Sequence, residues 1–84
     1  MKPIRLSKHA TGYLGSRGFT AAEVVDAIRT ATWGPAELGR RECRKDLPFH
    51  ADWNGRPYAT KQVRPVFVDE PNEIVVITVY TYYF

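Results

Sequence analysis

The sequence predicts an α+β domain in which two N-terminal helices pack on one face of a three- to four-stranded antiparallel sheet. Apolar residues at helical spacing are confined to the first part of the chain, up to Ala31. Alternating apolar residues and turn dipeptides follow, and a run of β-branched and aromatic residues extends from Ile74 to Phe84. Since 84 residues suffice for one domain, we expect residues 1–84 to form a single unit with one open sheet face.

The first helix is expected to follow a short lead-in strand and to run to Arg17. Ser7 is a suitable N-cap because its hydroxyl can accept from a free amide of the first turn. Gly12 and Gly15 each cost about 1 kcal/mol relative to alanine inside a helix, so this helix needs support from packing. Gly18 can adopt the left-handed conformation that ends it.

The second helix has the clearest start. Thr20 and Glu23 have the spacing of a capping box, and Phe19 with Val24 has the spacing of a hydrophobic staple. Its apolar stripe comprises Ala21, Val24, Val25, Ile28 and Ala31. The Trp33-Gly34-Pro35 sequence ends the helix, because glycine breaks the pattern and proline disfavours a helical residue before it.

The second half of the chain is expected to form a meander of strands. Residues 37–45 are mostly charged and suit a loop or a protected edge strand. Apolar residues alternate over residues 47–53, and Asn54-Gly55 is the dipeptide preferred in a type I′ hairpin. The returning chain over residues 56–68 forms either one strand bent at its proline or two extended runs. A turn at residues 69–72 then leads into the final strand.

Strict alternation assigns two faces to the final strand. One face carries Val75, Ile77, Val79, Thr81 and Tyr83, which we expect to seal the core. The other carries Ile74, Val76, Thr78, Tyr80 and Tyr82. Because this second face ends in hydroxyl-bearing residues, we expect its far end to be open to a ligand.

Charge is modest but unevenly distributed. Twelve Lys and Arg against nine Asp and Glu give a formal net charge of +3. Basic residues without acidic ones occupy the chain before Glu23 and again over residues 56–64. This arrangement favours a polyanionic partner such as nucleic acid, although small basic domains without such a partner are common.

The single cysteine, Cys43, excludes an internal disulfide, and with two histidines it leaves too few ligands for a structural zinc site. We therefore expect no metal and no cofactor. The N-terminal residues lack the apolar core of a signal peptide, and no apolar run reaches the roughly 18 residues of a membrane span. These features favour a cytoplasmic protein without a membrane partner.

Three short motifs resemble a small bacterial family of unassigned function. They are Ser7-Lys8-His9-Ala10, then Arg17-Gly18-Phe19-Thr20 with Glu23-Val24, and finally Val76-Ile77-Thr78-Val79-Tyr80. The layout is similar to that of the BrnT toxins and, more remotely, of the RelE/ParE-like toxins. The resemblance implies a RelE/ParE-like domain, in a superfamily that includes metal-independent ribonucleases, toxins that inhibit DNA gyrase, and members without known activity.

On this resemblance we expect His9, Thr78 and Tyr80 to be catalytic residues, and we add Arg64 to them as a cation that could reach the same face. An imidazole can take a proton from a ribose 2′-hydroxyl, and an arginine can stabilise the charge of a phosphoryl transition state. Thr78 can bind the phosphate, and Tyr80 can stack a base. The alternatives are that His9 only orients its helix and that Thr78 and Tyr80 are present because their shapes favour strands.

We expect Arg17, Arg56, Lys61 and Tyr82 to bind substrate, for which RNA, alone or on the ribosome, is the leading candidate. The alternative for each cation, Arg64 included, is a solvated surface position, and Arg17 is also explained as a cation that complements the dipole at a helix C-terminus. The basic run at residues 40–45 could also contact a phosphate backbone, although a solvated edge explains it equally well. One alternative function is a non-catalytic module that binds an antitoxin-like protein. The other is a toxin that inhibits a topoisomerase.

Overall fold

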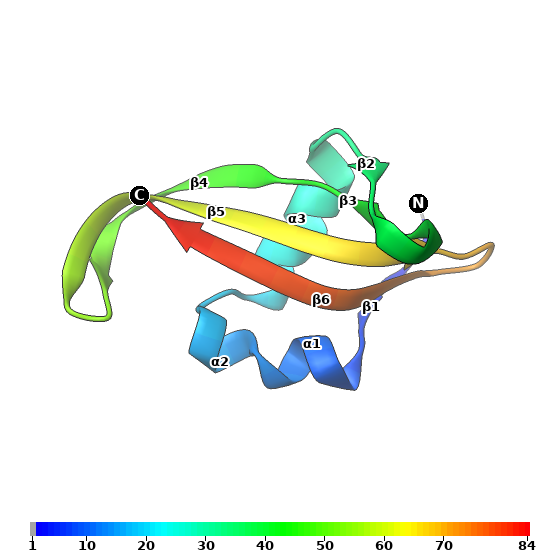
Figure 1. The fold of residues 1–84 in the computed structure, drawn as a ribbon, viewed down its shortest axis with the longest axis horizontal. Coiled ribbons are helices and arrows are strands. Elements are labelled where there is room, and N and C mark those ends of the chain that lie inside the picture. Colours follow the sequence, from blue (N-terminus) through cyan, green and yellow to red (C-terminus); the bar gives the residue numbers. More distant parts are fainter. Residues whose placement is uncertain (1) are drawn as a thin grey trace.

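The computed structural model of the protein describes residues 2–84 and contains a six-stranded mixed sheet with three short α-helices. The elements, in chain order, are β1 (Ile4–Leu6), α1 (Lys8–Gly12), α2 (Leu14–Arg17), α3 (Ala21–Thr30), β2 (Gly34–Pro35), the 3₁₀ turn η1 (Glu37–Gly39), β3 (Arg41–Glu42), β4 (Lys45–Trp53), β5 (Arg56–Asp69) and β6 (Ile74–Tyr83). Figure 1 shows α3 crossing behind the sheet and α1 and α2 running alongside β6.

The predicted fold class of two helices on a three- to four-stranded antiparallel sheet is wrong. The sheet order is β1-β6-β5-β3-β2, with β4 also paired to β5. Strand β1 pairs with β6 in parallel, with Ile4 opposite Ile74, so the sheet is mixed. The additional strands arise because β6 and β5 each present a long edge of backbone donors and acceptors: β1 pairs with β6, β3 pairs with β5, and β2 pairs in turn with β3.

The first helix is divided in two. Ser7 caps α1 as expected, its hydroxyl accepting from the amide of Ala10 at 3.1 Å. The helix stops at Tyr13, whose amide donates to the carbonyl of Ala10 at 3.2 Å. The break lies between Gly12 and Gly15, the two residues that most weaken helix in this segment. The expectation of one continuous helix to Arg17 is therefore wrong.

The local signals around α3 are confirmed. Gly18 has φ of 70° and ends α2 in the left-handed conformation. The hydroxyl of Thr20 accepts from the amide of Glu23 at 3.1 Å, and the Glu23 carboxylate accepts from the amide of Thr20 at 2.9 Å. These two bonds are the predicted capping box. Phe19 and Val24, the predicted staple pair, are both buried.

The hairpin between β4 and β5 is also confirmed. Asn54 and Gly55 both have positive φ, 51° and 80°, as a type I′ turn requires. Strand β5 passes through Pro65 without interruption, so the returning chain is one strand. Strand β4 carries an irregularity between Pro48 and Ala51, where His50 has φ of 46°.

Strand β6 contains a bulge that the alternation pattern did not predict. Phe67 of β5 lies opposite Val76, whereas Val66 lies opposite Thr78, so Ile77 is an additional residue. Because a single extra residue reverses which side chains point to each face, the core face of β6 carries Ile74 and Val76 before the bulge and Val79 after it. The predicted faces are therefore correct beyond the bulge and wrong before it.

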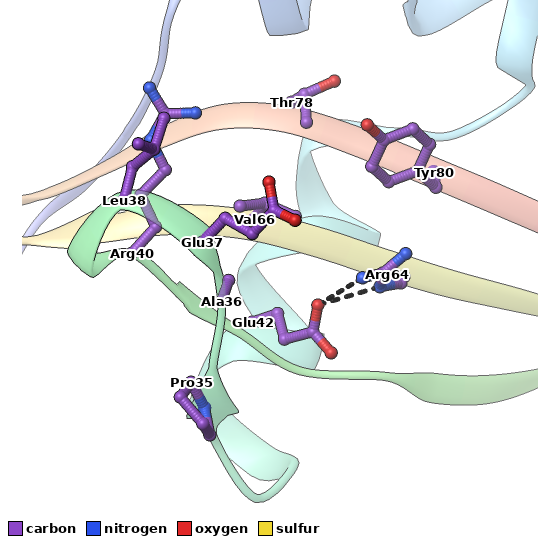
Figure 2. Close-up of a pocket in the computed structure, with 10 residues that line it drawn as sticks. All are labelled: Pro35, Ala36, Glu37, Leu38, Arg40, Glu42, Arg64, Val66, Thr78 and Tyr80. Atoms are coloured by element: carbon purple, nitrogen blue, oxygen red, sulfur yellow. Dashed lines mark hydrogen bonds and ion pairs between the residues drawn. The ribbon is translucent and has the colours of Figure 1, made fainter.

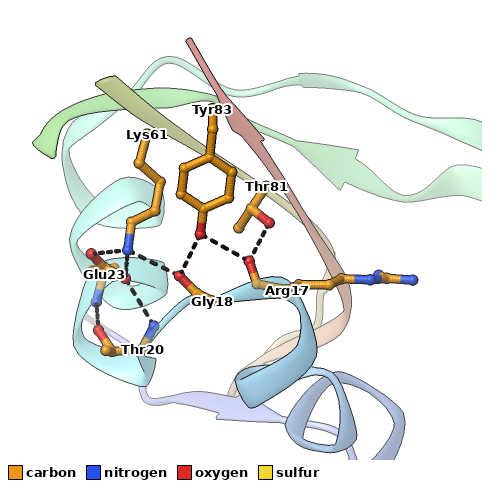
Figure 3. A network of polar contacts seen from close by, with 7 residues as sticks. All are labelled: Arg17, Gly18, Thr20, Glu23, Lys61, Thr81 and Tyr83. Atoms are coloured by element: carbon orange, nitrogen blue, oxygen red, sulfur yellow. Dashed lines mark hydrogen bonds and ion pairs between the residues drawn. The ribbon is translucent and has the colours of Figure 1, made fainter. Parts of the chain in front are cut away.

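The core lies between the sheet and the helices. It contains Ala10, Phe19, Val24, Ala27, Ile28, Cys43, Val63, Phe67, Ile74, Val76 and Val79. At one end of this layer the buried Lys61 donates to the carbonyl of Gly18 at 3.0 Å and to Glu23 at 2.9 Å. Tyr83 donates from its hydroxyl to the same Gly18 carbonyl (Figure 3). Polar contacts thus tie the sheet to the end of α2.

Candidate functional site

The side of the sheet away from the helices, which we call the open face, carries most of the predicted site residues. Three cross-strand pairs from β5 and β6 form its centre: Val66 with Thr78, Arg64 with Tyr80, and Gln62 with Tyr82. Residues that lie directly opposite on neighbouring strands share a face and contact each other. The structure therefore brings Thr78, Tyr80, Tyr82 and Arg64 together, although they come from two strands.

A groove of about 640 Å³ lies on this face. Its floor consists of Glu42, Arg64, Val66, Thr78 and Tyr80, and its rim is the segment of residues 35–40 around η1 (Figure 2). The floor residues belong to β3, β5 and β6, and Figure 2 shows the η1 segment to one side of them. The groove combines carboxylate, guanidinium and hydroxyl groups with one aromatic ring.

Arg17 reaches the open face from the end of α2. Its Nη1 donates to the hydroxyl of Thr78 at 3.1 Å and to the backbone carbonyl of Val79 at 2.9 Å. The guanidinium lies 3.8 Å from the centre of the Tyr13 ring and 5.2 Å from that of Tyr80. Among residues 2–84 these bonds occupy one nitrogen of the guanidinium, which leaves the Nε and Nη2 donors for an anion.

Arg64 lies across from Tyr80 on β5, with its guanidinium 5.3 Å from the ring centre. Its Nε donates to Glu42 at 3.0 Å, its Nη2 donates to the same carboxylate, and its Nη1 reaches the hydroxyl of Tyr82 at 3.4 Å. The hydrogen bond to Glu42, followed by that to Tyr82, raises the pKa of Arg64. The group is therefore a permanent cation whose planar edge is held by a carboxylate.

His9 lies further from the groove than the other predicted catalytic residues. Its exposed ring meets Tyr13 edge-on, with 4.9 Å between ring centres. Contacts then run from Tyr13 to Arg17 and from Arg17 to Thr78. Within residues 2–84, His9 forms no hydrogen bond with Thr78. Two side chains thus link the imidazole to the site.

Two of the predicted substrate-binding cations lie elsewhere. Lys61 is buried on the helix side of the sheet and is paired with Glu23. Arg56 lies beside the hairpin turn, opposite Trp53. It is eight residues along β5 from Arg64, which corresponds to roughly 26 Å of strand. Neither residue contributes to the groove.

The basic run at residues 40–45 does not form one surface. Arg40 lies on the groove rim. Arg41 lies 5.9 Å from the ring centre of Trp33, Cys43 is buried, and Lys45 is paired with Asp26 at 2.6 Å. The alternation of the strand therefore divides these charges between two faces.

Two residues of the site were not predicted from the sequence. Glu42 holds the guanidinium of Arg64, and Tyr13 packs against that of Arg17. Glu42 belongs to the charged run of residues 40–45, and nothing in that run singles it out. Its partner Arg64 becomes evident only from the pairing of β3 with β5. Tyr13 lies at the break between α1 and α2, where its ring packs against the guanidinium of Arg17.

Other kinds of site are not found in the described residues. Among residues 2–84, no group of three or more His, Cys, Asp or Glu side chains is placed to hold a metal ion. None of the helices within this range is long and apolar enough to cross a membrane.

Comparison with known proteins identifies no matching family model, no similar curated protein and no similar solved structure. The motif resemblance to the BrnT and RelE/ParE-like toxins therefore stays a prediction. Function has to be argued from the chemistry of the open face.

Proposed function

We propose that the protein binds single-stranded RNA on the open face of its sheet. The observation that supports this most directly is Tyr80, which is 39% exposed and has the guanidinium groups of Arg17 and Arg64 5.2 and 5.3 Å from its ring centre. An exposed ring can stack on a nucleobase, and the Nε and Nη2 donors of Arg17 can form two parallel hydrogen bonds to a phosphate. Arg64, whose Nε edge is held by Glu42, adds its positive charge and its remaining Nη protons. Thr78 adds a hydroxyl beside Arg17. The site thus offers groups for a base and for its flanking phosphates.

The binding test uses fluorescence anisotropy with a labelled single-stranded RNA. Arg64→Gln should weaken binding and reduce the slope of log affinity against log salt by about 0.7, the value for one phosphate contact on a single strand. Arg29→Gln is the matched control, because it removes the same charge from the last turn of α3. Absence of binding at low salt, or equal effects of the two substitutions, would contradict the proposal.

The catalytic part of the proposal is metal-independent cleavage of the bound RNA. The ribose 2′-hydroxyl attacks the adjacent phosphate, His9 takes its proton, and Arg17, which contacts the same Tyr13 ring as His9, stabilises the charge on the phosphoryl oxygens. The leaving 5′-oxygen takes a proton from solvent. The exposure of His9 and its link to Arg17 through Tyr13 support this assignment. The substrate has to extend from the groove across α1 for the imidazole to reach it.

Cleavage is tested by incubating the purified protein with RNA in EDTA. Products with 2′,3′-cyclic phosphate ends, lost in His9→Ala and retained in His50→Ala, are the expected result. His50 is a suitable control because it lies in the β4 irregularity, away from the groove. Intact RNA, both alone and with ribosomes, would refute the catalytic part and leave RNA binding to be judged by anisotropy.

A protein-binding module is the second candidate function, and Leu38 is the observation that favours it. This side chain is 84% exposed on the groove rim, and its φ of 60° is unusual for a residue other than glycine. A strained, exposed apolar residue suits a contact with a partner such as an antitoxin-like protein. Harmless expression in a bacterial host, with His9→Ala and Thr78→Ala changing only stability, would favour this candidate over the ribonuclease.

A further inference from the structure

The exposed aromatic side chains of the protein are not scattered. Within residues 2–84, the exposed large apolar residues are Leu38, Tyr80, Tyr82 and Phe84, with exposed fractions of 84%, 39%, 40% and 58%. Three of the four are aromatic residues at every second position of one strand. We call Tyr80, Tyr82 and Phe84 the aromatic row.

The register of the sheet places this row on the open face. Tyr80 lies opposite Arg64 and Tyr82 lies opposite Gln62. Phe84 continues the same ladder, since it exchanges backbone hydrogen bonds with Thr60 at 2.8 and 3.0 Å. These bonds hold Phe84 in the direction of the strand, so its ring follows the two tyrosines on the same side.

The spacing of the row limits what it can bind. Residues two apart on a strand are separated by roughly 6.7 Å. Stacked bases within one strand of a duplex lie about 3.4 Å apart, which is half that step. One base per ring is therefore compatible only with a strand whose bases are separated from one another. Unpaired RNA can adopt this arrangement and present each base to an aromatic side chain.

The charges along the row favour nucleic acid over a protein surface. Both arginines of the groove lie at the Tyr80 end, and Arg64 also holds the hydroxyl of Tyr82 at 3.4 Å. Towards Phe84 the neighbouring positions on β5 are the neutral Gln62 and Thr60. The arginines can thus bind a phosphate at the Tyr80 end. The bases that follow can cover Tyr82 and Phe84 without desolvating a charged side chain, because the neighbouring positions are neutral.

We propose that Tyr80, Tyr82 and Phe84 stack three consecutive unstacked bases of single-stranded RNA, with the phosphate at the Tyr80 end bound by Arg17 and Arg64. This inference rests on the proposed RNA binding. It adds that three nucleotides are bound, that the RNA is single-stranded, and that it lies along β6 from Tyr80 to Phe84. Stacking on a ring accepts any base, so the row should bind with little sequence preference.

The test measures the affinity of labelled oligouridines of one to six nucleotides by anisotropy. Affinity should rise with each nucleotide up to three or four and then level off, and a duplex of the same length should bind less well. Tyr82→Ala and Phe84→Ala should each lower the affinity for the hexamer by about fivefold or more. Val25→Ala, which removes a half-buried apolar side chain from α3 on the other side of the sheet, is the control and should have no effect on RNA affinity.

The outcomes separate this inference from the proposal on which it rests. Loss of binding in Arg64→Gln, with none in Tyr82→Ala or Phe84→Ala, overturns the aromatic row and leaves RNA binding standing. A dimer in light scattering that Phe84→Ala dissolves, with unchanged RNA affinity, overturns it in favour of a contact between two copies of the chain. No binding of any oligomer at low salt overturns both.

Discussion

Replacement of Gly18 by alanine is expected to be among the most damaging small changes in this protein. The residue has φ of 70°, and a Cβ there would meet the hydroxyl of Tyr83 and, at 2.6 Å, the indole ring of Trp53. The two rings stack with 4.8 Å between their centres, and Tyr83 also contacts Phe49. Movement of one ring therefore disturbs a cluster rather than a single side chain.

The magnitude follows from two contributions. A left-handed conformation costs a residue with a Cβ roughly 1–2 kcal/mol. The hydroxyl of Tyr83 donates to the carbonyls of Arg17 and Gly18 at 3.2 and 3.1 Å, and displacing it forfeits about 1 kcal/mol or more. The sum of about 3 kcal/mol corresponds to a fall in Tm of roughly 12–24 °C for a domain of this size.

Urea and thermal unfolding followed by circular dichroism measure the effect. Gly15→Ala is the matched control, because a Cβ there has no neighbour within 4 Å and Gly15 lies inside α2. It should raise the free energy of unfolding by about 0.5–1 kcal/mol. If Gly18→Ala is no less stable than the wild type, or if both alanines change stability alike, the explanation through backbone conformation and the Tyr83 contacts is refuted.

Three further predictions concern buried and paired groups. Lys61→Met should lower the free energy of unfolding in urea by about 1–3 kcal/mol, since it leaves Glu23 half-buried without its cation, and a further Glu23→Gln should recover part of the loss. Burial, assisted by the charge of Glu42, raises the pKa of Cys43 to about 11. The folded state therefore keeps this thiol protonated where the unfolded state loses its proton, so stability should fall as pH rises from about 9 to 11. Cys43→Ala should remove that part of the alkaline loss in pH-dependent thermal unfolding, and an unchanged profile would contradict it. Glu42→Gln should strengthen RNA binding about fivefold in anisotropy, because it frees the edge of Arg64 for phosphate, and weaker binding would show that the carboxylate positions the arginine instead.

Most features that depend on neighbours in sequence were predicted correctly, and the break of the first helix between Gly12 and Gly15 is the exception. The cap at Ser7, the capping box of Thr20 with Glu23, the left-handed Gly18 and the Asn54-Gly55 turn all involve residues within four positions of each other. Their geometry is determined by a few backbone bonds, so residue type at fixed spacing is sufficient to identify them.

Features that depend on distant pairing were not predicted. The parallel pairing of β1 with β6 joins Ile4 to Ile74, and no property of either segment specifies the partner. The orientation of Lys61 is a similar case. Its charge predicted an exposed side chain, but the ammonium group is buried, where it donates to the carbonyl of Gly18 and the carboxylate of Glu23. In such cases tertiary contacts outweigh the preference of the residue type.

The candidate site was predicted only in part, because some of its residues are placed by local alternation and others by pairing between distant strands. Thr78, Tyr80 and Tyr82 were assigned to one face by alternation, which holds beyond the bulge. The partner of Arg64 could not be inferred, because Glu42 approaches through β3, a strand of two residues with no periodic signal.

The extra residue at Ile77 makes β6 sensitive to insertions and deletions in a particular way. Removing one residue near this position, with the pairing to β5 kept at both ends, would restore simple alternation. A chain shortened there keeps nearly the same composition and apolar run. However, either Ile74 and Val76 would then point away from the core, or Tyr80 and Tyr82 would point into it. Changes of length, more than changes of residue type, therefore decide whether this strand can have a sealed half and an exposed half.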